Sequence, residues 1–252
     1  MGALHSGHAQ LVERARAECE AVVVSIFVNP TQFDRPEDLA RYPRVLDADL
    51  ALCESLGVDV VFAPTAAEMY PTPPACVVDV ARLTDHLCGR FRPGHFQAVA
   101  TVVTKLLQIV QPDRAYFGEK DAQQLAVVRR LVTDLNIPVA IVGVPTVREA
   151  DGLALSSRNR HLSPDERQRA TLLIRALKEA ERLIVAGERD AHAVVAAARA
   201  TLSEGPAIRL EYLEIVDPEE LQPVTSIVGP ALVAGALWIG TTRLIDNLLV
   251  HP

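Results

Sequence analysis

Two histidines near the start of the chain have the spacing and the setting for phosphate chemistry. His5 and His8 flank Ser6 and Gly7, directly before a segment with helical spacing. A glycine lets the backbone approach a ligand closely, and the N-terminus of a helix offers free N–H groups and a partial positive charge. The two imidazoles can donate N–H groups to a phosphorus centre as negative charge builds up in the transition state. The pattern also fits an ordinary turn in which one histidine caps the helix, so both interpretations stay open here.

A second polar cluster, Phe117–Asp121, lies between a predicted strand and a predicted helix. Lys120 would supply a point charge for phosphate oxygens. Asp121 and the backbone of Gly118 could hold sugar hydroxyls. Alternatively, Asp121 is only the N-cap of the helix and Lys120 is a solvated surface charge.

A third cluster, 151–159, places two hydroxyls and a guanidinium in a row at Ser156, Ser157 and Arg158. Such a trio can clamp a phosphate, because a guanidinium binds two oxygens at once. The alternative is a polar loop whose serines bond to their own backbone. Three clusters of phosphate-binding type at turn positions of one chain favour a common nucleotide site over three unrelated loops.

Other polar side chains are weaker candidates. Amide side chains can orient a small hydroxy acid without adding charge, although each of them also fits a solvated surface. We interpret the acidic pair Asp47 and Asp49 as a solvated helix turn. The amides that follow a strand or open a helix are Asn29, Gln32, Gln123 and Gln124.

Composition excludes several classes of protein. Among 252 residues, 25 Lys and Arg stand against 32 Asp and Glu, and the net charge of −7 argues against a nucleic-acid-binding protein. A 49% hydrophobic share excludes a disordered chain. No apolar run approaches the ~18 residues of a membrane span, and no secretory signal is present. The four cysteines form no CxxC pair and no His cluster has zinc spacing, so we expect no protein metal site and a reducing, cytoplasmic setting.

The polar clusters need a scaffold, and the first half of the chain predicts one. Apolar runs rich in β-branched residues alternate with helical patterns, which is typical of a Rossmann-like, doubly wound parallel sheet. Such sheets bind ligands at the carboxyl ends of their strands, where these clusters fall. The expected strands are 21–28, 58–62, 77–80, 114–117 and 139–142, and the expected helices are 9–20, 45–56, 96–110 and 121–135.

The pattern changes after about residue 147. Ser163, Pro164 and Glu166 predict a capped start for one long amphipathic helix that ends near Gly187. A second helix over 191–202 and three strands follow, which predicts a smaller α+β domain. We therefore expect a Rossmann-like domain at 1–147 and a C-terminal α+β lid domain at 148–252. The three strands are expected at 209–215, 231–239 and 243–250.

These residues occur in motifs that resemble the pantothenate synthetase (pantoate–β-alanine ligase) family, within a wider His-x-Gly-His nucleotidyl-transferase superfamily. The resemblance runs in order from the first residue to the last few, and the motifs together are highly specific. They are MGALHSGH (1–8), SIFVNPTQF (25–33), RPGHF (92–96), PDRAYFGEKDAQQL (112–125), IVGVPTVREADGLALSSRNRHLS (141–163) and GTTRLIDN (240–247).

The resemblance implies an enzyme that forms an amide bond from pantoate and β-alanine. ATP would first activate pantoate as pantoyl adenylate with release of pyrophosphate, and β-alanine would then displace AMP. Magnesium is implied by the use of ATP, without a nameable protein ligand. A cytoplasmic homodimer that binds neither nucleic acid nor membrane is also implied.

The family motifs also assign residues by position. His8 matches the proton donor and His5 its partner on the phosphates, with Lys120 and Arg158 as the other catalytic groups. Gln32 and Gln124 match pantoate contacts, and Gln32 also matches a β-alanine contact. The residues that match ATP contacts are Met1, Gly2, Ala3, Leu4, His5, Ser6, Gly7, His8, Gly118, Glu119, Lys120, Asp121, Val147, Leu155, Ser156, Ser157 and Arg158.

The sequence departs from the family in three places. Family members carry roughly one more strand and helix before Met1, so we expect the true start to lie upstream. Ala98 replaces a usual glycine and Ala122 a usual aromatic residue.

Two alternative functions stay open. One is a nucleotidyltransferase that stops at a nucleotidyl product, and the other is a catalytically inactive truncated homologue.

Overall fold

The computed structural model describes residues 2–33, 35–202 and 208–252, and the chain forms two compact units. The N-terminal unit comprises Met1–Val80, Arg92–Glu119 and Val127–Val147. The C-terminal unit comprises Ala81–Phe91, Lys120–Ala126 and Arg148–Pro252. One division therefore falls between Val147 and Arg148, and two earlier segments group with the C-terminal residues. The domain assignment made from the sequence stays a prediction.

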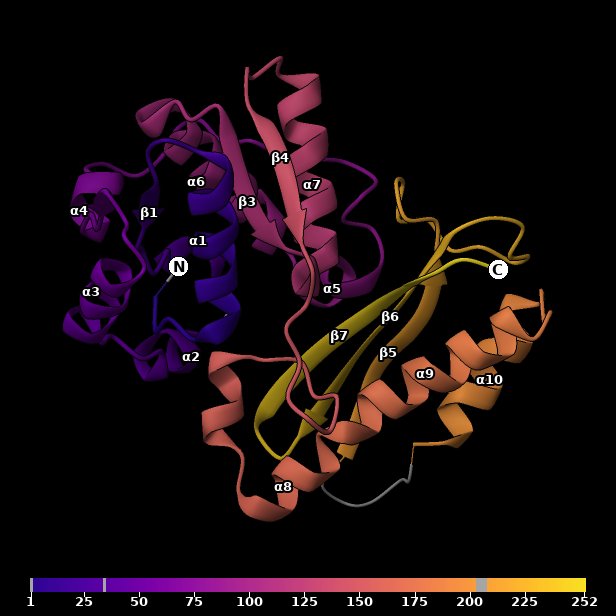
Figure 1. Cartoon of the computed structure of the whole chain (residues 1–252). Helices are drawn as coiled ribbons and strands as arrows, with labels where there is room; N and C mark the ends of the chain where they lie inside the picture. Colours follow the sequence, from indigo (N-terminus) through magenta and orange to yellow (C-terminus); the bar gives the residue numbers. More distant parts are fainter. Residues whose placement is uncertain (1, 34, 203–207) are drawn as a thin grey trace. The chain divides into compact units, whose positions relative to one another are not determined.

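The N-terminal unit is built from parallel strand pairs with helices between them, so the α/β class is confirmed (Figure 1). Strand β1 pairs with β2, and β3 pairs with β4, each in parallel. The predicted single sheet is thus present as two two-stranded sheets in the described part of the chain. The elements are α1 (Ser6–Glu18), β1 (Val23–Ser25), η1 (Pro30–Gln32), α2 (Pro36–Arg41), α3 (Leu46–Ser55), β2 (Val60–Phe62), α4 (Ala66–Met69), α6 (His95–Val110), β3 (Arg114–Gly118) and β4 (Ala140–Val144).

A small apolar core holds the start of the chain to the first sheet. Helix α1 buries Val12 and Ala15, which lie three residues apart on one helical face. They pack with residues of β1 and with Cys53 of α3. Gly57 ends the turn after α3 with a φ of +69°, as expected for a glycine stop. Burial on one face of α1 therefore fixes the helix that carries the histidine motif.

The predicted strand at 77–80 is wrong. This segment is irregular, and the backbone N–H of Val78 donates to the hydroxyl of Thr101 at 2.9 Å. A backbone donor bonded to a helix side chain is not available for a strand ladder. The short β-branched run gave a strand signal that the tertiary contact overrode.

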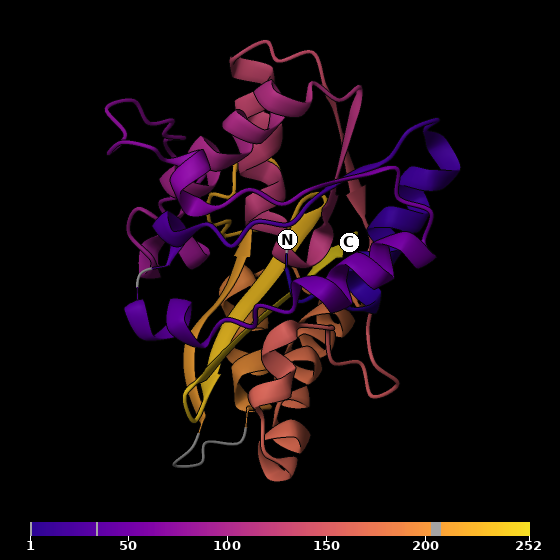
Figure 2. The same ribbon diagram turned by 90° about the vertical axis from the view of Figure 1, so that its left-hand side faces the viewer.

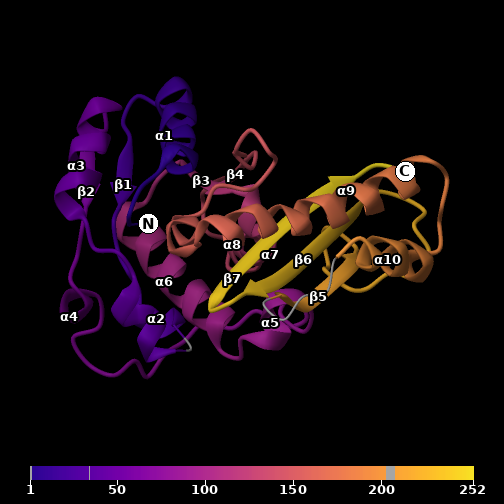
Figure 3. The ribbon, with the colours of Figure 1, turned by 90° about the horizontal axis from the view of Figure 1, so that it is seen from below.

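The C-terminal unit is an antiparallel sheet with helices packed on it, which is an α+β arrangement. The strand order is β5–β6–β7, and Figures 2 and 3 show the long strands with α9 and α10 alongside. Helix α9 packs closely on β6 at Gly235, where an added Cβ would lie 2.8 Å from a methyl carbon of Leu173 and would displace that side chain. The elements are α5 (Leu87–Phe91), η3 (Ser157–His161), α8 (Pro164–Arg169), α9 (Thr171–Val185), α10 (Ala191–Ala200), β5 (Ile208–Val216), β6 (Ala231–Ile239) and β7 (Thr242–Val250). Helix η2 (Glu119–Asp121) and helix α7 (Ala122–Asp134) contain residues of both units.

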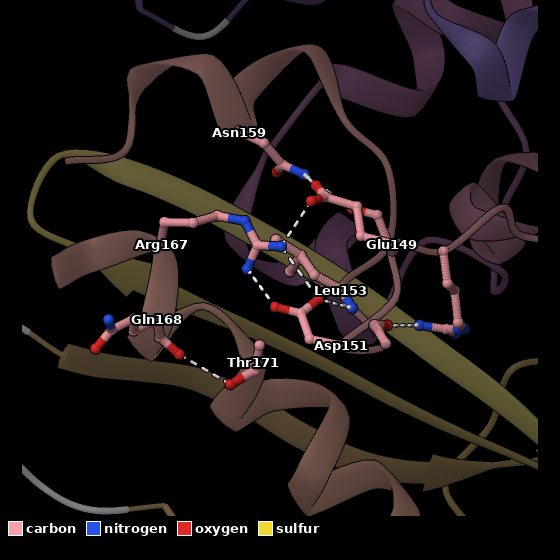
Figure 4. Close-up of polar contacts among 10 residues, drawn as sticks. Glu149, Asp151, Leu153, Asn159, Arg167, Gln168 and Thr171 are labelled. Carbon is pink, nitrogen blue, oxygen red and sulfur yellow. Dashed lines mark hydrogen bonds and ion pairs between the residues drawn. The ribbon is translucent and has the colours of Figure 1, made fainter. Parts of the chain in front are cut away.

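The long helix predicted from residue 163 is two helices. Ser163 and Glu166 form the predicted capping box at the start of α8. Helix α8 ends at Arg169 and α9 begins at Thr171, whose hydroxyl donates to the carbonyl of Gln168 at 2.8 Å (Figure 4). The side chain of Thr171 thus bonds back to the last turn of α8 at the point where the two helices meet.

Candidate functional site

The histidine motif is ordered by its own backbone. His5 is the N-cap of α1, and its Nδ1 accepts the N–H of Gly7 at 3.1 Å. The N–H of His5 in turn donates to Nδ1 of His8 at 3.3 Å, and the two ring centroids lie 4.1 Å apart. Because both Nδ1 atoms accept, each neutral ring carries its proton on Nε2. The capping interpretation is thus correct for His5.

A buried carboxylate holds the residues just before this motif. Asp49 of α3 is 3% exposed, and its two oxygens accept the N–H groups of Ala3 at 2.9 Å and of Leu4 at 2.7 Å. Ala3 has a φ of 51°, a left-handed conformation that is unfavourable for a residue with a Cβ. The interpretation of Asp49 as a solvated helix turn is wrong. The missed signal was its position four residues before Cys53, on the buried face of α3.

The other predicted ATP residues of the N-terminal unit lie on short loops and strand ends. Gly2, Ala3 and Leu4 are buried and Ser6 is exposed. The half-buried Gly118 is the last residue of β3, and Val147 follows β4. Met1 lies outside the described residues. Gly118 and Val147 thus lie at or after the carboxyl ends of parallel strands, whereas Gly2, Ala3 and Leu4 precede α1 and follow no described strand.

Gln32 lines a cavity of about 340 Å³ in the N-terminal unit, a size suited to a small molecule. The carbonyl of Gln32 accepts hydrogen bonds from Arg92 Nη2 at 3.0 Å and from His95 Nδ1 at 2.9 Å. Asn29 is 2% exposed, and its side chain binds Thr31 and the carbonyl of Ala98. The RPGHF motif therefore holds the backbone at Gln32, which the sequence did not reveal.

The C-terminal unit brings Lys120, Ser156 and Arg158 to one hollow of about 20 Å³, together with Asn159. That volume holds about one water-sized group, so the hollow suits one polar end of a ligand. Ser156 Oγ accepts the N–H of Arg158 at 3.2 Å. Ser156 therefore makes the bond to its own loop backbone that was the alternative to phosphate binding. The exposed side chain of Arg158 and the ammonium of Lys120 supply positive charge there.

The loop that carries these residues is held by ion pairs (Figure 4). Arg167 of α8 donates to Asp151 at 2.8 and 3.1 Å and to Glu149 at 2.6 Å. Glu149 also accepts from Asn159 Nδ2 at 3.3 Å, and the same amide reaches the carbonyl of Ala154. The hydrogen bond from the Arg167 guanidinium lowers the pKa of the Asp151 carboxyl below its usual 3.8. This network was not predicted, because its members are 2 to 18 residues apart without a helical or strand period.

The two glutamines that open α7 differ. Gln123 is 6% exposed, and its amide donates to the carbonyls of Leu83 and His86 at 2.8 Å each. Gln123 therefore holds the segment 81–91 in place through backbone carbonyls. Its amide N–H groups are used in this structural role and not in binding a ligand. Gln124 is half-buried on the neighbouring turn position. It belongs to the C-terminal unit, whereas Gln32 belongs to the N-terminal unit.

The predicted site residues therefore form three groups. His5 and His8 are in contact at the start of α1, Gln32 lines its cavity, and Lys120 shares a hollow with Ser156 and Arg158. The remaining ATP positions, Glu119, Asp121, Leu155 and Ser157, are half-buried or exposed beside these groups in sequence. Within residues 2–33, 35–202 and 208–252, no group of three His, Cys, Asp or Glu side chains could hold a metal ion. In the same ranges, no helix has the length and apolarity to cross a membrane.

Comparisons with known proteins give consistent results. Residues 1–249 match the family model described as pantoate-beta-alanine ligase. A bifunctional pantoate ligase/cytidylate kinase of Synechococcus elongatus is 61% identical over 100% of this chain and 48% of its own length. The pantothenate synthetase of Heliobacterium modesticaldum is 57% identical over 100% of this chain and 89% of its own. The chain thus spans about half the length of the bifunctional relatives that it matches.

Solved structures agree in fold. A pantothenate synthetase from Thermus thermophilus has a TM-score of 0.96 at 53% identity, with 100% of this chain and 91% of that chain covered. A pantoate-beta-alanine ligase from Francisella tularensis, complexed with beta-gamma ATP and beta-alanine, has a TM-score of 0.80 at 35% identity. It covers 99% of this chain and 87% of that chain.

Proposed function

Because the chain belongs to the pantoate-β-alanine ligase family, we propose that it joins pantoate to β-alanine at the expense of ATP. The observation that supports this most directly is the geometry of the histidine motif. Backbone N–H groups donate to Nδ1 of both His5 and His8, and the two imidazole rings are in contact at the N-terminus of α1. That arrangement suits a reaction in which negative charge builds on a phosphate.

The proposed reaction has two displacements. A carboxylate oxygen of pantoate attacks the α-phosphorus of ATP, the bond to the bridging oxygen breaks, and pyrophosphate leaves with the bonding electrons. The amine of β-alanine then attacks the acyl carbon of pantoyl adenylate, loses a proton and expels AMP. Neither step needs a covalent enzyme intermediate. The protein contributes positioning and charge stabilisation.

The proposed ATP contacts follow, residue by residue, the positions that match the motifs of the family. His8 and His5 donate to phosphate oxygens, and His8 is the proton donor. Lys120 and Arg158 neutralise charge on the departing pyrophosphate, with Ser156 and Ser157 as hydroxyl donors beside them. The buried turn at Gly2, Ala3 and Leu4 and the loop at Gly118, Glu119 and Asp121 contact the nucleotide. Val147 and Leu155 offer backbone contacts to adenine.

Pantoate and β-alanine are assigned to the cavity beside Gln32. Its volume of about 340 Å³ accommodates a small hydroxy acid. The bonds from Arg92 and His95 fix the backbone at Gln32, and Nδ2 of Asn29 donates to Oε1 of its side chain at 3.5 Å. Gln124 is the second proposed pantoate contact. The relative from Francisella tularensis, which was solved with β-alanine, supports a β-alanine site.

We also propose a cytoplasmic homodimer that uses Mg²⁺ with ATP. Mg²⁺ keeps several water ligands and binds substrate phosphates in many such sites.

The test is an exchange experiment with the purified chain. ³²P-labelled pyrophosphate should enter ATP when pantoate is present and β-alanine is absent. Addition of β-alanine should then yield pantothenate and AMP in equal amounts, measured by chromatography. Exchange that does not require pantoate would favour a nucleotidyltransferase. Absence of both exchange and product, with ATP still bound, would favour an inactive homologue, and formation of ADP would contradict the proposed chemistry.

A further inference from the structure

Strand β7 carries a charged residue in the register of its buried face. Thr242, Leu244 and Asp246 alternate along the strand and are all buried, and Asp246 is 5% exposed. A buried carboxylate without a partner lowers the stability of the fold, so the partner of Asp246 indicates its structural role. Asp246 accepts two hydrogen bonds from the guanidinium of Arg148, at 2.6 Å from Nη1 and 2.9 Å from Nη2.

Arg148 lies at the base of the hairpin that leads to the Ser156–Arg158 loop. It pairs with Ala154 in an antiparallel bridge, and its Nη1 donates to the carbonyl of Gly152 at 3.0 Å. Its Nη2 also reaches the carbonyl of Asn247 at 3.2 Å. The ion pair with Asp246 therefore attaches this hairpin to β7.

The next residue of β7, Asn247, binds the backbone at Lys120. Asn247 Nδ2 donates to the carbonyl of Lys120 at 2.9 Å, and the N–H of Asn247 donates to Asp246 Oδ1 at 2.8 Å. Asn247 thus contacts the backbone of Lys120, and its neighbour Asp246 contacts Arg148. Arg148 in turn anchors the hairpin that leads to the Ser156–Arg158 loop. Asp246 also lines the hollow that Lys120, Ser156 and Arg158 share.

We propose that Asp246 and Asn247 are a positioning pair for ATP. They act through Lys120 and Arg148 and set the distance between the ammonium of Lys120 and the guanidinium of Arg158. This inference rests on the proposed function, since it assumes that both cations bind the same polyphosphate. Strand β7 is paired with β6 along its whole length, Thr242–Val250, so its backbone moves less than a loop does, which is why such a pair on β7 can fix two loops.

The proposal predicts a selective loss of ATP affinity. Asn247→Asp keeps the shape of the side chain and removes its donor, and Asn247→Ala removes the donor without adding charge. Each should raise KM for ATP about five- to tenfold, which corresponds to one neutral hydrogen bond. Asp246→Asn should raise KM for ATP about tenfold or more, because the bond to Arg148 is charge-assisted. KM for β-alanine should stay within twofold of wild type for all three.

The experiment is steady-state pantothenate formation, with thermal unfolding of each variant measured in parallel. Asn136→Asp and Asp47→Asn make the same chemical changes at exposed positions of the N-terminal unit and should leave all constants unchanged. A merely structural role would lower kcat with every KM unchanged, and that outcome would overturn the proposal. So would an unchanged KM for ATP in all three folded variants.

Failure of the proposed function gives a different result. In that case the wild-type chain forms no pantothenate, and binding of ATP measured by calorimetry replaces KM as the readout. Weaker binding by the Asn247 and Asp246 variants would then still support the positioning role. Equal binding by wild type and all variants would overturn it.

Discussion

The histidine motif and the Lys120 hollow hold candidate phosphate-binding groups by different physical means. In the histidine motif, backbone N–H groups donate to His5, to His8 and to the single carboxylate of Asp49. In the C-terminal unit, ion pairs that share partners hold the loop, and Arg167 alone contacts two carboxylates. The first arrangement depends on backbone N–H groups that donate to buried or half-buried acceptors, whereas the second distributes its stabilisation over several ion pairs.

This difference indicates where single substitutions act most strongly. A buried acceptor whose bonds are not shared leaves unpaired N–H groups when it is lost. A half-exposed ion pair in a network can be replaced by its neighbours or by water. We therefore expect larger effects from the histidine motif than from the network around Arg167.

The largest effect is expected from His5→Asn. Asparagine is a good N-cap residue, so helix α1 should keep its cap while the Nε2–H donor is lost. The rate of pantothenate formation should fall about 10²- to 10⁴-fold, with little change in melting temperature. His192→Asn, at an exposed helical histidine of the C-terminal unit, is the control. A loss of activity below tenfold would mean that His5 only caps the helix.

Asp49→Asn should mainly reduce stability. One oxygen remains to accept an N–H of the Ala3–Leu4 turn, and the other N–H meets an amide that cannot accept. The free energy of unfolding should fall by about 2 kcal/mol in urea titrations, the cost of an unsatisfied buried donor. Asp47→Asn on the exposed side of α3 should change it by less than about 0.5 kcal/mol. If Asp49→Asn and Asp47→Asn lowered the free energy of unfolding equally, the buried bonds of Asp49 would not stabilise the histidine motif more than a surface carboxylate does.

Arg167→Met should cost less than Asp49→Asn. The Arg167 side chain is 26% exposed, Asp151 is 45% exposed, and Glu149 keeps its bond from Asn159. We expect a loss of about 0.5–1 kcal/mol in the same urea titrations, in the range of partly exposed ion pairs. A loss above that of Asp49→Asn would show that the network is not redundant.

The smallest effect is a pH dependence. Because Arg167 lowers the pKa of Asp151 in the folded state, the pair stabilises the fold above the ordinary value of 3.8. That stabilisation is lost as the pH falls through the lower, folded-state pKa. The stability difference between wild type and Arg167→Met should therefore be constant near neutral pH and shrink below pH 3.8. A difference that does not vary with pH would assign it to packing of the Arg167 side chain.

Local signals in the sequence predicted most elements and the caps. The spacing of α6, the capping box at Ser163 and the stop at Gly57 depend on neighbours within one helical turn, which a sequence displays directly. The strand expected at 77–80 and the single helix from 163 to 186 failed where one tertiary or turn contact outweighed local preference. The family resemblance, based on motifs along the whole chain, was confirmed by the match over residues 1–249.

Sequence by itself determined the residue types that can bind phosphate and the turns that carry them, since both depend on short-range chemistry. Only the tertiary structure decided which residues hold those turns in place. Asp49 reaches Ala3 from 46 positions away and Asp246 reaches Arg148 from 98 positions away. Such pairings depend on how distant segments pack against a shared core, and no local period in the chain encodes that packing.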